Sequence, residues 1–268
     1  MFASLSPARR RFVLVLAAAL AAIAAVVAAI AIREVGSGAV DPVAQDEPGP
    51  VLLVSGYGGS AAPVEALARQ LRVQGRDASV VPPVGNGTAD LRTQAEQLDG
   101  AARRAMTRTA AGSVDVVGYS AGGVVARLWV RDFDGASKAR RVLSLGSPQH
   151  GTSVAERVVG TLPGQCPKAC GQLAPDSDLL RGLNAGDETP RGPVFISIWS
   201  TSDEVVTPPD TARLAGATNF TIQSVCANAR VSHAQVPSNK VVRGVVAQVL
   251  GPDAPRVPSA SDCGGFSS

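Results

Sequence analysis

A serine flanked by glycines is the residue of this chain best suited to covalent chemistry. Ser120 stands in Gly118-Tyr119-Ser120-Ala121-Gly122, between a β-type run at 113–117 and a helical run at 124–133. A Gly-x-Ser-x-Gly in that setting is typical of a nucleophile elbow, a strained strand-to-helix turn that lifts the serine hydroxyl above a sheet. The same pentapeptide arises by chance in a chain with 28 glycines. The sequence must therefore also supply a base, an acid and an oxyanion hole.

The chain has two histidines that could serve as the base. A serine hydroxyl is a weak nucleophile near neutral pH and needs a base, which a third group must orient and charge-balance. Chains with a nucleophile elbow carry these residues in the order Ser, Asp or Glu, His. Only His233 leaves room for an acid at a strand end between itself and Ser120. We therefore predict His233 as the base and His150 as a solvated or hydrogen-bonded loop residue.

Asp203 is the predicted acid. It follows the strand-like run at 194–199, and carboxylates at the carboxyl ends of parallel strands face the crevice where ligands bind. Glu204 is adjacent but is expected to point elsewhere. Asp187 and Asp210 lie in loop or proline-rich segments and are expected to be surface charges.

The backbone amides of Tyr57 and Ala121 are the predicted oxyanion hole. Ala121 follows the nucleophile directly, and Tyr57 belongs to the glycine-rich loop Gly56-Tyr57-Gly58-Gly59 after an early strand. The alternatives for this loop are a plain tight turn or a phosphate site. A phosphate site is disfavoured because no lysine follows as in a P-loop, and the Gly-x-Gly-x-x-Gly spacing fails.

Apolar runs alternating with helical patterns predict the elements that position these residues. Short apolar runs suit strands buried on both faces of a parallel sheet, and the segments between them suit helices that cover those faces. The predicted fold class is α/β, with a mostly parallel central sheet of about six strands flanked by helices. Strands are predicted at 51–54, 78–81, 113–117, 141–145, 194–199 and 220–225, and helices at 63–74, 90–108, 124–133 and 241–250.

One globular domain is expected over residues 50–251. Residues 34–49 are rich in Gly, Pro, Asp and Glu and predict a linker, and residues 252–268 predict a C-terminal tail. Residues 152–192 interrupt the alternation of strands and helices. A long insertion after the carboxyl end of a strand is a typical place for a lid over a substrate pocket.

Residues 1–33 are predicted to be a signal or membrane-anchor segment. Arg9, Arg10 and Arg11 precede an unbroken apolar run, Phe12 to Ile32. The run exceeds the ~7–15 residues of a secretory signal and reaches the ~18 of a membrane span, which favours a retained anchor. Its many alanines, and a cleavage-like Ala29-Ile30-Ala31, leave a cleaved signal as the alternative. Both place the rest of the chain outside the cytoplasm.

The four cysteines agree with export. An even count in an exported chain suggests two disulfides, for which three pairings exist. We predict Cys166–Cys170, which would close a small surface loop, and Cys226–Cys263, which would tie the C-terminal tail to the body. A metal site is the competing interpretation, but Cys166-x3-Cys170 has no second close pair and no nearby histidine.

The charge distribution argues against a nucleic-acid partner. The net charge is +3, and the three N-terminal arginines account for much of the excess. Nucleic-acid-binding proteins usually carry a basic stripe interleaved with aromatic side chains, and this chain has none.

Four segments resemble bacterial secreted lipases and esterases of the α/β-hydrolase superfamily, in consistent order over residues 50 to 250. The resemblance implies a compact α/β-hydrolase in which Ser120, Asp203 and His233 hydrolyse carboxylic esters through an acyl-enzyme. Ser55 stands where the family commonly has a histidine that supports the oxyanion loop, which bears on efficiency more than on reaction class. The segments are Val54-Ser55-Gly56-Tyr57-Gly58-Gly59, Gly118-Tyr119-Ser120-Ala121-Gly122-Gly123, Leu145-Gly146-Ser147-Pro148-Gln149-His150-Gly151-Thr152 and Ser202-Asp203-Glu204-Val205-Val206.

Cys166-Pro167-Lys168-Ala169-Cys170 also resembles the disulfide-bearing loop of actinobacterial members. Together these observations predict a serine carboxylic-ester hydrolase that acts outside the cytoplasm on an ester or lipid, without a metal or organic cofactor. An acyltransferase or thioesterase with the same triad, or a catalytically silent envelope-associated binding module, are the alternatives.

Overall fold

The computed structural model describes residues 11, 15–16, 18–26 and 40–267. The chain divides into two units, Met1–Val40 and Asp41–Ser268. Much of the predicted anchor, including residues 12–14, 17 and 27–32, lies outside the described residues. Among the residues that are described, no helix combines the length and hydropathy needed to cross a membrane.

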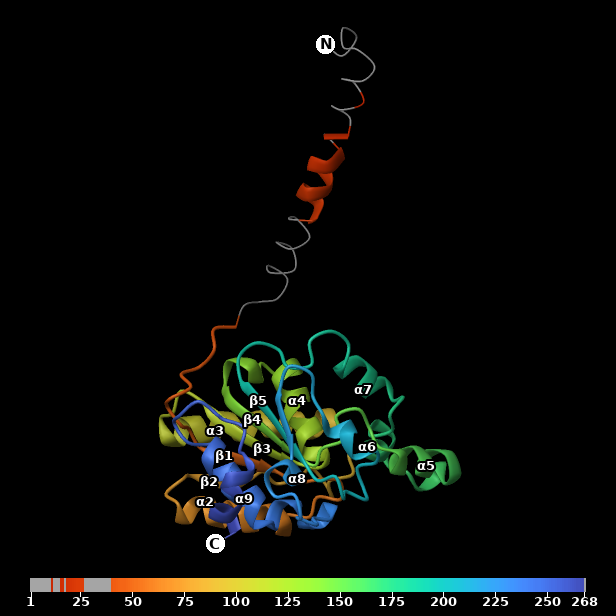
Figure 1. Ribbon diagram of the computed structural model, residues 1–268. Helices are drawn as coiled ribbons and strands as arrows, with labels where there is room; N and C mark the ends of the chain where they lie inside the picture. The colour runs from red at the N-terminus through yellow and green to blue at the C-terminus, as the bar shows by residue number, and fades with distance from the viewer. Residues whose placement is uncertain (1–10, 12–14, 17, 27–39, 268) are drawn as a thin grey trace. The chain divides into compact units, whose positions relative to one another are not determined.

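A six-stranded, all-parallel sheet forms the centre of the second unit (Figure 1). The strand order is β2-β1-β3-β4-β5-β6, so the chain changes direction across the sheet between β1 and β3. Ligands of open parallel sheets bind at the carboxyl ends of strands beside such a switch point. The prediction of an α/β fold with a central parallel sheet is confirmed. The strands are β1 (Val51–Val54), β2 (Ala78–Val80), β3 (Val114–Tyr119), β4 (Ala139–Leu145), β5 (Val194–Trp199) and β6 (Thr218–Thr221).

Helices cover both faces of this sheet (Figure 1). On one face, α2 (Ala62–Val73) and α9 (Lys240–Val249) bury their apolar stripes against alternate strand residues such as Leu53 and Val117. On the other face, α3 (Leu91–Thr109) packs beside α4 (Ala121–Asp132). The remaining helices are η1 (Gly135–Ser137), α5 (Ser153–Thr161), η2 (Pro163–Gln165), α6 (Lys168–Gln172), α7 (Asp178–Leu183), η3 (Pro209–Ala212), α8 (Ile222–Val225), η4 (His233–Ser238), η5 (Ala260–Asp262) and α10 (Cys263–Ser267).

The last strand is shorter than its sequence pattern predicts. A strand was expected over 220–225, but β6 ends at Thr221 and residues 222–225 form α8. The side-chain oxygen of Thr221 accepts a hydrogen bond from the backbone N–H of Ser224 at 3.0 Å and thereby caps the new helix. The strand prediction is therefore wrong beyond Thr221, because a local cap overrides the alternating pattern.

Both predicted disulfides form. Cys166–Cys170 closes the loop that enters α6, and Cys226–Cys263 joins the end of α8 to the start of α10. These bonds engage all four cysteines, which excludes the metal-site interpretation of Cys166 and Cys170. Beyond Cys263, the ring of Phe266 packs so closely on α9 that a Cβ at Gly244 would lie 2.3 Å from it.

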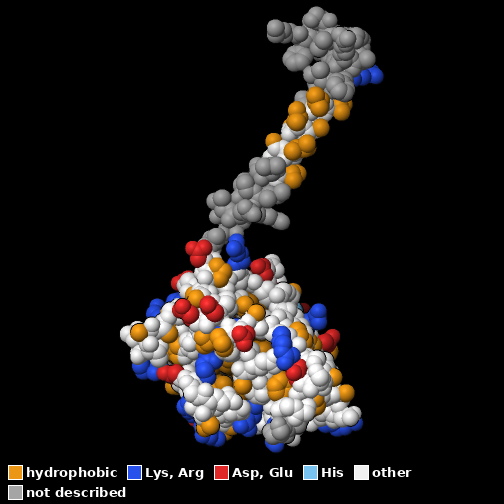
Figure 2. All heavy atoms as spheres, turned by 60° about the vertical axis from the view of Figure 1, so that its left-hand side comes forward, with side chains coloured by type: hydrophobic (Ala, Val, Ile, Leu, Met, Phe, Trp, Pro, Cys, Tyr) orange, Lys and Arg blue, Asp and Glu red, His pale blue; other side chains and the backbone are white. Residues whose placement is uncertain are grey.

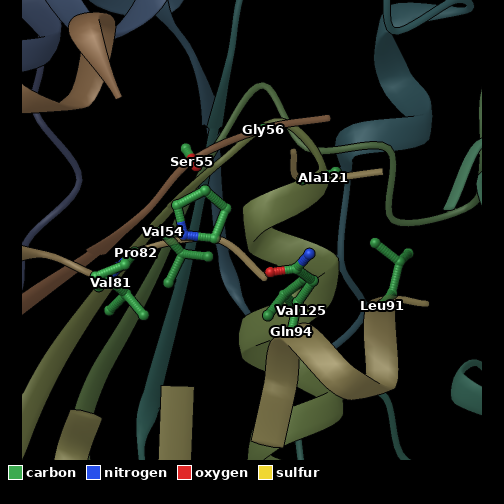
Figure 3. Close-up of a pocket in the computed structure, with 11 residues that line it drawn as sticks. Val54, Ser55, Gly56, Val81, Pro82, Leu91, Gln94, Ala121 and Val125 are labelled. Atoms are coloured by element: carbon green, nitrogen blue, oxygen red, sulfur yellow. The ribbon is translucent and has the colours of Figure 1, made fainter. Parts of the chain in front are cut away.

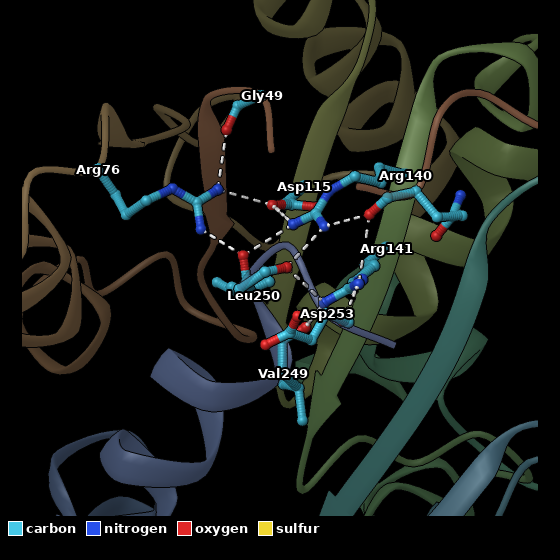
Figure 4. Close-up of polar contacts among 10 residues, drawn as sticks. Gly49, Arg76, Asp115, Arg140, Arg141, Val249, Leu250 and Asp253 are labelled. Carbon is cyan, nitrogen blue, oxygen red and sulfur yellow. Dashed lines mark hydrogen bonds and ion pairs between the residues drawn. The ribbon is translucent and has the colours of Figure 1, made fainter. Parts of the chain in front are cut away.

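A buried charge cluster ties both ends of the second unit to the amino ends of the strands (Figure 4). Asp115 of β3 is fully buried and accepts hydrogen bonds from Arg140 at 2.6 and 2.9 Å and from Arg76 at 2.8 Å. Arg140 also donates to the carbonyls of Gln45, Leu250 and Gly251. Carbonyls at the end of a helix such as α9 attract cations because they carry the negative end of the helix dipole.

Arg141 extends this cluster. It donates to the carbonyls of Val249, Gly251 and Asp253. Burial and, after it, the charge of Arg140 lower the pKa of Arg141 to about 10, which still leaves the guanidinium charged at neutral pH. The face of the molecule shown in Figure 2 carries acidic and basic side chains interspersed with apolar ones.

Replacing Asp115 by alanine is expected to destabilise the fold severely, because the fully buried Arg140 would lose its carboxylate partner. Breaking a buried ion pair by removing one partner costs about 3–5 kcal/mol, which denaturant unfolding would measure. Asp178→Ala is the matched control, since its ion pair with Arg181 is exposed and is expected to contribute little. An equal, small effect for both substitutions would contradict this role of Asp115.

Candidate active site

Ser120 occupies a sharp turn between β3 and α4. Its backbone has φ 54° and ψ −127°, a conformation that is strained for any residue with a side chain. The turn requires glycine on both sides: a Cβ at Gly118 would lie 2.4 Å from the backbone of Gly122, and one at Gly122 would lie 2.3 Å from the carbonyl oxygen of Val54. The turn therefore has the geometry expected of a nucleophile elbow, and Ser120 stands at the N-terminus of α4.

The structure brings the three predicted catalytic side chains together. Ser120 Oγ lies 3.0 Å from His233 Nε2, and His233 Nδ1 lies 2.7 Å from Asp203 Oδ2. All three side chains are buried. The carboxylate of Asp203 is fixed in turn, because its Oδ1 accepts hydrogen bonds from the backbone N–H groups of Val205 at 2.9 Å and Val206 at 2.8 Å. The chain of contacts runs from serine to imidazole to carboxylate, as acyl transfer through a serine requires.

Two neighbours that sequence reasoning missed hold the backbone of His233. The Tyr119 hydroxyl donates to the carbonyl of His233 at 3.1 Å, and the ring centroids of the two residues lie 5.1 Å apart. Burial, followed by the charges of Asp203 and Glu204, raises the pKa of Tyr119 to about 12, so its hydroxyl stays protonated and able to donate. Glu204 accepts from the backbone N–H of His233 at 3.0 Å. As expected, Glu204 makes no hydrogen bond to the imidazole ring of His233. It does bind the backbone of that histidine, which was not expected.

Gly146 is a further residue that the sequence did not single out. It follows β4 with φ 54°, and a Cβ there would lie 3.2 Å from Asp203 Oδ2 and 3.6 Å from His233 Nδ1. The backbone at this point therefore lies directly against the Asp203–His233 pair. In the sequence, Gly146 is only a glycine that directly follows a strand. Its importance becomes visible only when the structure places it against Asp203.

The predicted oxyanion loop lies over the serine. A Cβ at Gly56 would lie 2.9 Å from Ser120 Cβ, so the loop backbone and the nucleophile are in contact. Tyr57 is exposed, whereas Ala121 is buried at the start of α4. Behind the loop, a cavity of about 20 Å³ has Ser55 on one wall and Gln94 on another (Figure 3).

An apolar pocket of about 190 Å³ opens beside Ser120. Most of its wall comes from residues 152–192, the insertion predicted to cover a substrate pocket. Such a pocket suits an apolar substituent on the carbonyl that Ser120 would attack. It is lined by Tyr57, Ser120, Pro148, Thr152, Val154, Ala155, Val158, Gln165, Cys170, Leu173, Val205 and Val206.

The rejected candidates lie apart from this constellation. His150 Nε2 is 2.8 Å from Glu188 Oε1, and its backbone N–H donates to the carbonyl of Thr211 at 3.1 Å. This agrees with the predicted hydrogen-bonded loop histidine. Asp187 and Asp210 are exposed, as expected of surface charges. Within the described residues, no group of three His, Cys, Asp or Glu side chains could hold a metal ion.

The chain, with its parallel sheet covered by helices on both faces, has the α/β-hydrolase fold, which it shares with solved lipases. More specifically, residues 104–245, just over half of the chain, match the family Lipase (class 2), and the protein belongs to that family. No curated protein matches the sequence.

Solved lipases share the fold at low sequence identity. Aspergillus fumigatus lipase B is 20% identical with a TM-score of 0.67, over 82% of this chain and 56% of its own. Bacillus licheniformis lipase BlEst2 is 18% identical in both of its solved forms. The TM-score is 0.65 for the propeptide form, over 82% of this chain and 54% of that one, and 0.62 for the mature form, over 80% and 95%. The protein thus spans about half the length of the first two chains and nearly all of the mature Bacillus lipase.

Substituting Gly146 by alanine is expected to lower kcat/KM by about tenfold or more. A misplacement of about 1 Å at reacting groups costs about 100-fold, and the new Cβ would displace the Asp203 carboxylate by a smaller distance. The new Cβ would strain the backbone and press on the Asp203 carboxylate. Gly182→Ala is the control, because a Cβ there meets no atom within 4 Å and the residue lies in α7. Steady-state kinetics of both variants, with unfolding curves, would check this. Unchanged kinetics for Gly146→Ala would show that the contact does not matter.

Proposed function

We propose that Ser120, His233 and Asp203 form the catalytic triad of this ester hydrolase, and that it acts outside the cytoplasm on carboxylic esters or lipids. The observation that carries the proposal is the continuous contact from Ser120 Oγ through the imidazole to the Asp203 carboxylate, beside an apolar pocket. The low-identity structural relatives are described as lipases, which agrees with this activity.

Each residue has a defined part in the proposed reaction. His233 Nε2 takes the proton of Ser120 as Oγ attacks the ester carbonyl, and Asp203 stabilises the resulting imidazolium and holds its tautomer. His233 then gives this proton to the departing alcohol, which leaves an acyl-enzyme. Water, activated by the same histidine, attacks the acyl-enzyme and releases the carboxylic acid.

The amides of Tyr57 and Ala121 are proposed to bind the tetrahedral oxyanion. Two features support this assignment: the loop that carries Tyr57 lies against Ser120, and Ala121 opens α4, whose N-terminal amides favour negative charge. Ser55, in the place of the family's usual histidine, is buried behind the same loop.

Export of the protein is proposed on the strength of its two disulfides, since such bonds persist in oxidising compartments. Its resemblance to secreted bacterial lipases, including the Cys166–Cys170 loop of actinobacterial members, agrees with export. Retention in a membrane through residues 1–33 stays a prediction, as do the proposed linker at 34–49, the domain at 50–251 and the tail at 252–268.

The two histidines provide a matched test. His233→Ala and Ser120→Ala are each expected to lower kcat by about 10⁴-fold or more, because members of a triad act as a unit. His150→Ala is expected to keep activity within a few-fold of wild type. Rates on a soluble ester and labelling by a fluorophosphonate probe would check this.

Three results would contradict the proposed triad. They are wild-type protein that is not labelled, equal labelling of wild type and Ser120→Ala, and a loss of activity in His150→Ala as large as that in His233→Ala. Hydrolysis measured in the presence of added alcohols would separate ester hydrolysis from acyl transfer.

A further inference from the structure

We propose that the pocket beside Ser120 selects esters of medium-chain acids, with about six to eight carbons in the acyl group, because a cavity of about 150 Å³ holds one benzene molecule. The pocket measures about 190 Å³, which accommodates slightly more carbon than benzene. The inference rests on the proposed function, since it takes Ser120 as the nucleophile and the pocket as the acyl site.

The direction of the pocket follows from α5. Thr152, which caps this helix, donates its hydroxyl to the carbonyl of Val205 at 2.6 Å and accepts from the N–H of Thr207 at 3.1 Å. The start of α5 is therefore fixed to the turn that follows Asp203. Val154 lines the pocket near this end, and Val158 lines it one helical turn, about 6 Å, further along. Figure 1 shows α5 pointing away from the sheet. Since Val158 comes one turn after Val154 on this helix, we infer that it forms the distal part of the pocket wall.

The part of the wall that comes from α6 (Lys168–Gln172) is held from several sides. Cys170 and Leu173 line the pocket from α6 and its C-terminal end. The disulfide to Cys166 closes the entry to α6, and the backbone N–H of Thr152 donates to the carbonyl of Leu173 at 3.0 Å.

Gln172 of α6 adds a further tie. Its amide donates to Asp90 at 2.8 Å and accepts from the N–H of Leu91 at 2.8 Å, which joins α6 to the start of α3. A wall fixed to two other elements resists widening. The first carbons of an acyl chain therefore lie on apolar side chains, and carbons beyond Val158 gain nothing from the pocket.

A series of soluble esters from acetate to dodecanoate, below their aggregation concentrations, tests this. We expect kcat/KM to rise about fourfold per methylene while each buries its surface, and then to level off or fall beyond about eight carbons. A rate that is flat from acetate onward, or that keeps rising through dodecanoate, would overturn the inference. If wild-type protein hydrolyses no ester at all, the proposed function itself fails.

Val158→Phe, which fills the distal part, is expected to lower the octanoate-to-butyrate ratio of kcat/KM by about tenfold. Val159→Phe is the matched control: it makes the same change on the next residue of α5, which is 39% exposed and does not line the pocket. Val158→Ala, which enlarges the pocket, is expected to move the chain length at which kcat/KM levels off to longer acyl groups. This variant keeps the test valid if Val158→Phe does not fold. An unchanged ratio in both Val158 variants would overturn the assignment.

A second inference concerns Gln94, a buried residue of α3. We infer that it is a positioning residue for the oxyanion loop. Its amide makes two reciprocal hydrogen bonds with Val84: the backbone N–H of Val84 donates to Gln94 Oε1 at 2.9 Å, and Gln94 Nε2 donates to the carbonyl of Val84 at 3.1 Å. Gln94 thereby fixes the turn over residues 84–87, whose backbone touches the oxyanion loop.

The contact between turn and loop is close. The N–H of Gly58 donates to the carbonyl of Gly87 at 3.3 Å, and a Cβ at Gly87 would lie 2.3 Å from the backbone N of Gly59. The cavity of about 20 Å³ between Gln94 and Ser55 leaves space behind the loop on this side (Figure 3). The turn held by Gln94 is therefore what limits movement of the loop toward α3.

Gln94→Leu keeps the side-chain bulk and removes both hydrogen bonds. We expect kcat on a soluble ester to fall about tenfold or more while KM changes little, because an oxyanion donor acts chiefly in the transition state. Gln97→Leu, on the same helix and outside this cavity lining, is the control. A lower unfolding free energy with unchanged kcat would assign Gln94 a purely structural role and overturn the inference.

Discussion

The site depends on the close approach of two backbones at the turn that carries Ser120. Strand β3 and helix α4 meet so tightly there that Gly118 has no room for a side chain, and Gly122 has none because the start of α4 lies against the carbonyl of Val54 in β1. Ser120 itself is held with a positive φ, a conformation that costs about 1–3 kcal/mol and persists only where the surroundings over-determine it. Those surroundings are a strand in the middle of a parallel sheet and a helix whose first residues are buried. Rigidity at this point is what directs the serine hydroxyl out of the sheet.

The parallel sheet then brings the partners of Ser120 to the same edge. Strands β3, β4 and β5 are neighbours, and their carboxyl ends lead to Ser120, Gly146 and Asp203. The chain returns after β6 to place His233 between the serine and the carboxylate. Because all strands point the same way, residues far apart in sequence converge without long loops of their own. The insertion over 152–192 contributes none of these residues and forms most of the pocket wall.

The sequence predicted those parts of the site that follow from position along the chain. Ser120 and Asp203 each come after a strand, and His233 was selected by its order in the chain; both position and order can be read from the sequence alone. Glu204 and Gly146 were not predicted, because their importance lies in contacts with His233 and Asp203 that only the folded chain creates. The pocket volume could not be predicted from the sequence for the same reason.

The fold shows the same division between local and distant effects. Alternating strands and helices were predictable from hydrophobic runs, and the sheet has the expected six strands. The prediction of a strand over 220–225 is wrong beyond Thr221, because the Thr221 side chain caps α8 there. The ion pair between Asp115, in the middle of an apolar run, and Arg140 could not be predicted from the sequence. A charge inside a strand pattern is informative only once its partner, from another strand, is known.

The charge cluster and the nucleophile turn lie at opposite ends of β3, and this separation has a physical consequence. Asp115 lies near the amino end of the strand and gathers Arg76 and Arg140, together with the carbonyls at the end of α9. Ser120 follows the carboxyl end of the same strand. Breaking the buried ion pair would weaken the contacts that hold both ends of the domain to the sheet and lower its free energy of unfolding. It would leave the contacts of Ser120 unchanged. Changes at Gly118 or Gly122 are expected to disturb the site itself, because a Cβ at either position would clash with backbone packed at the turn that holds Ser120.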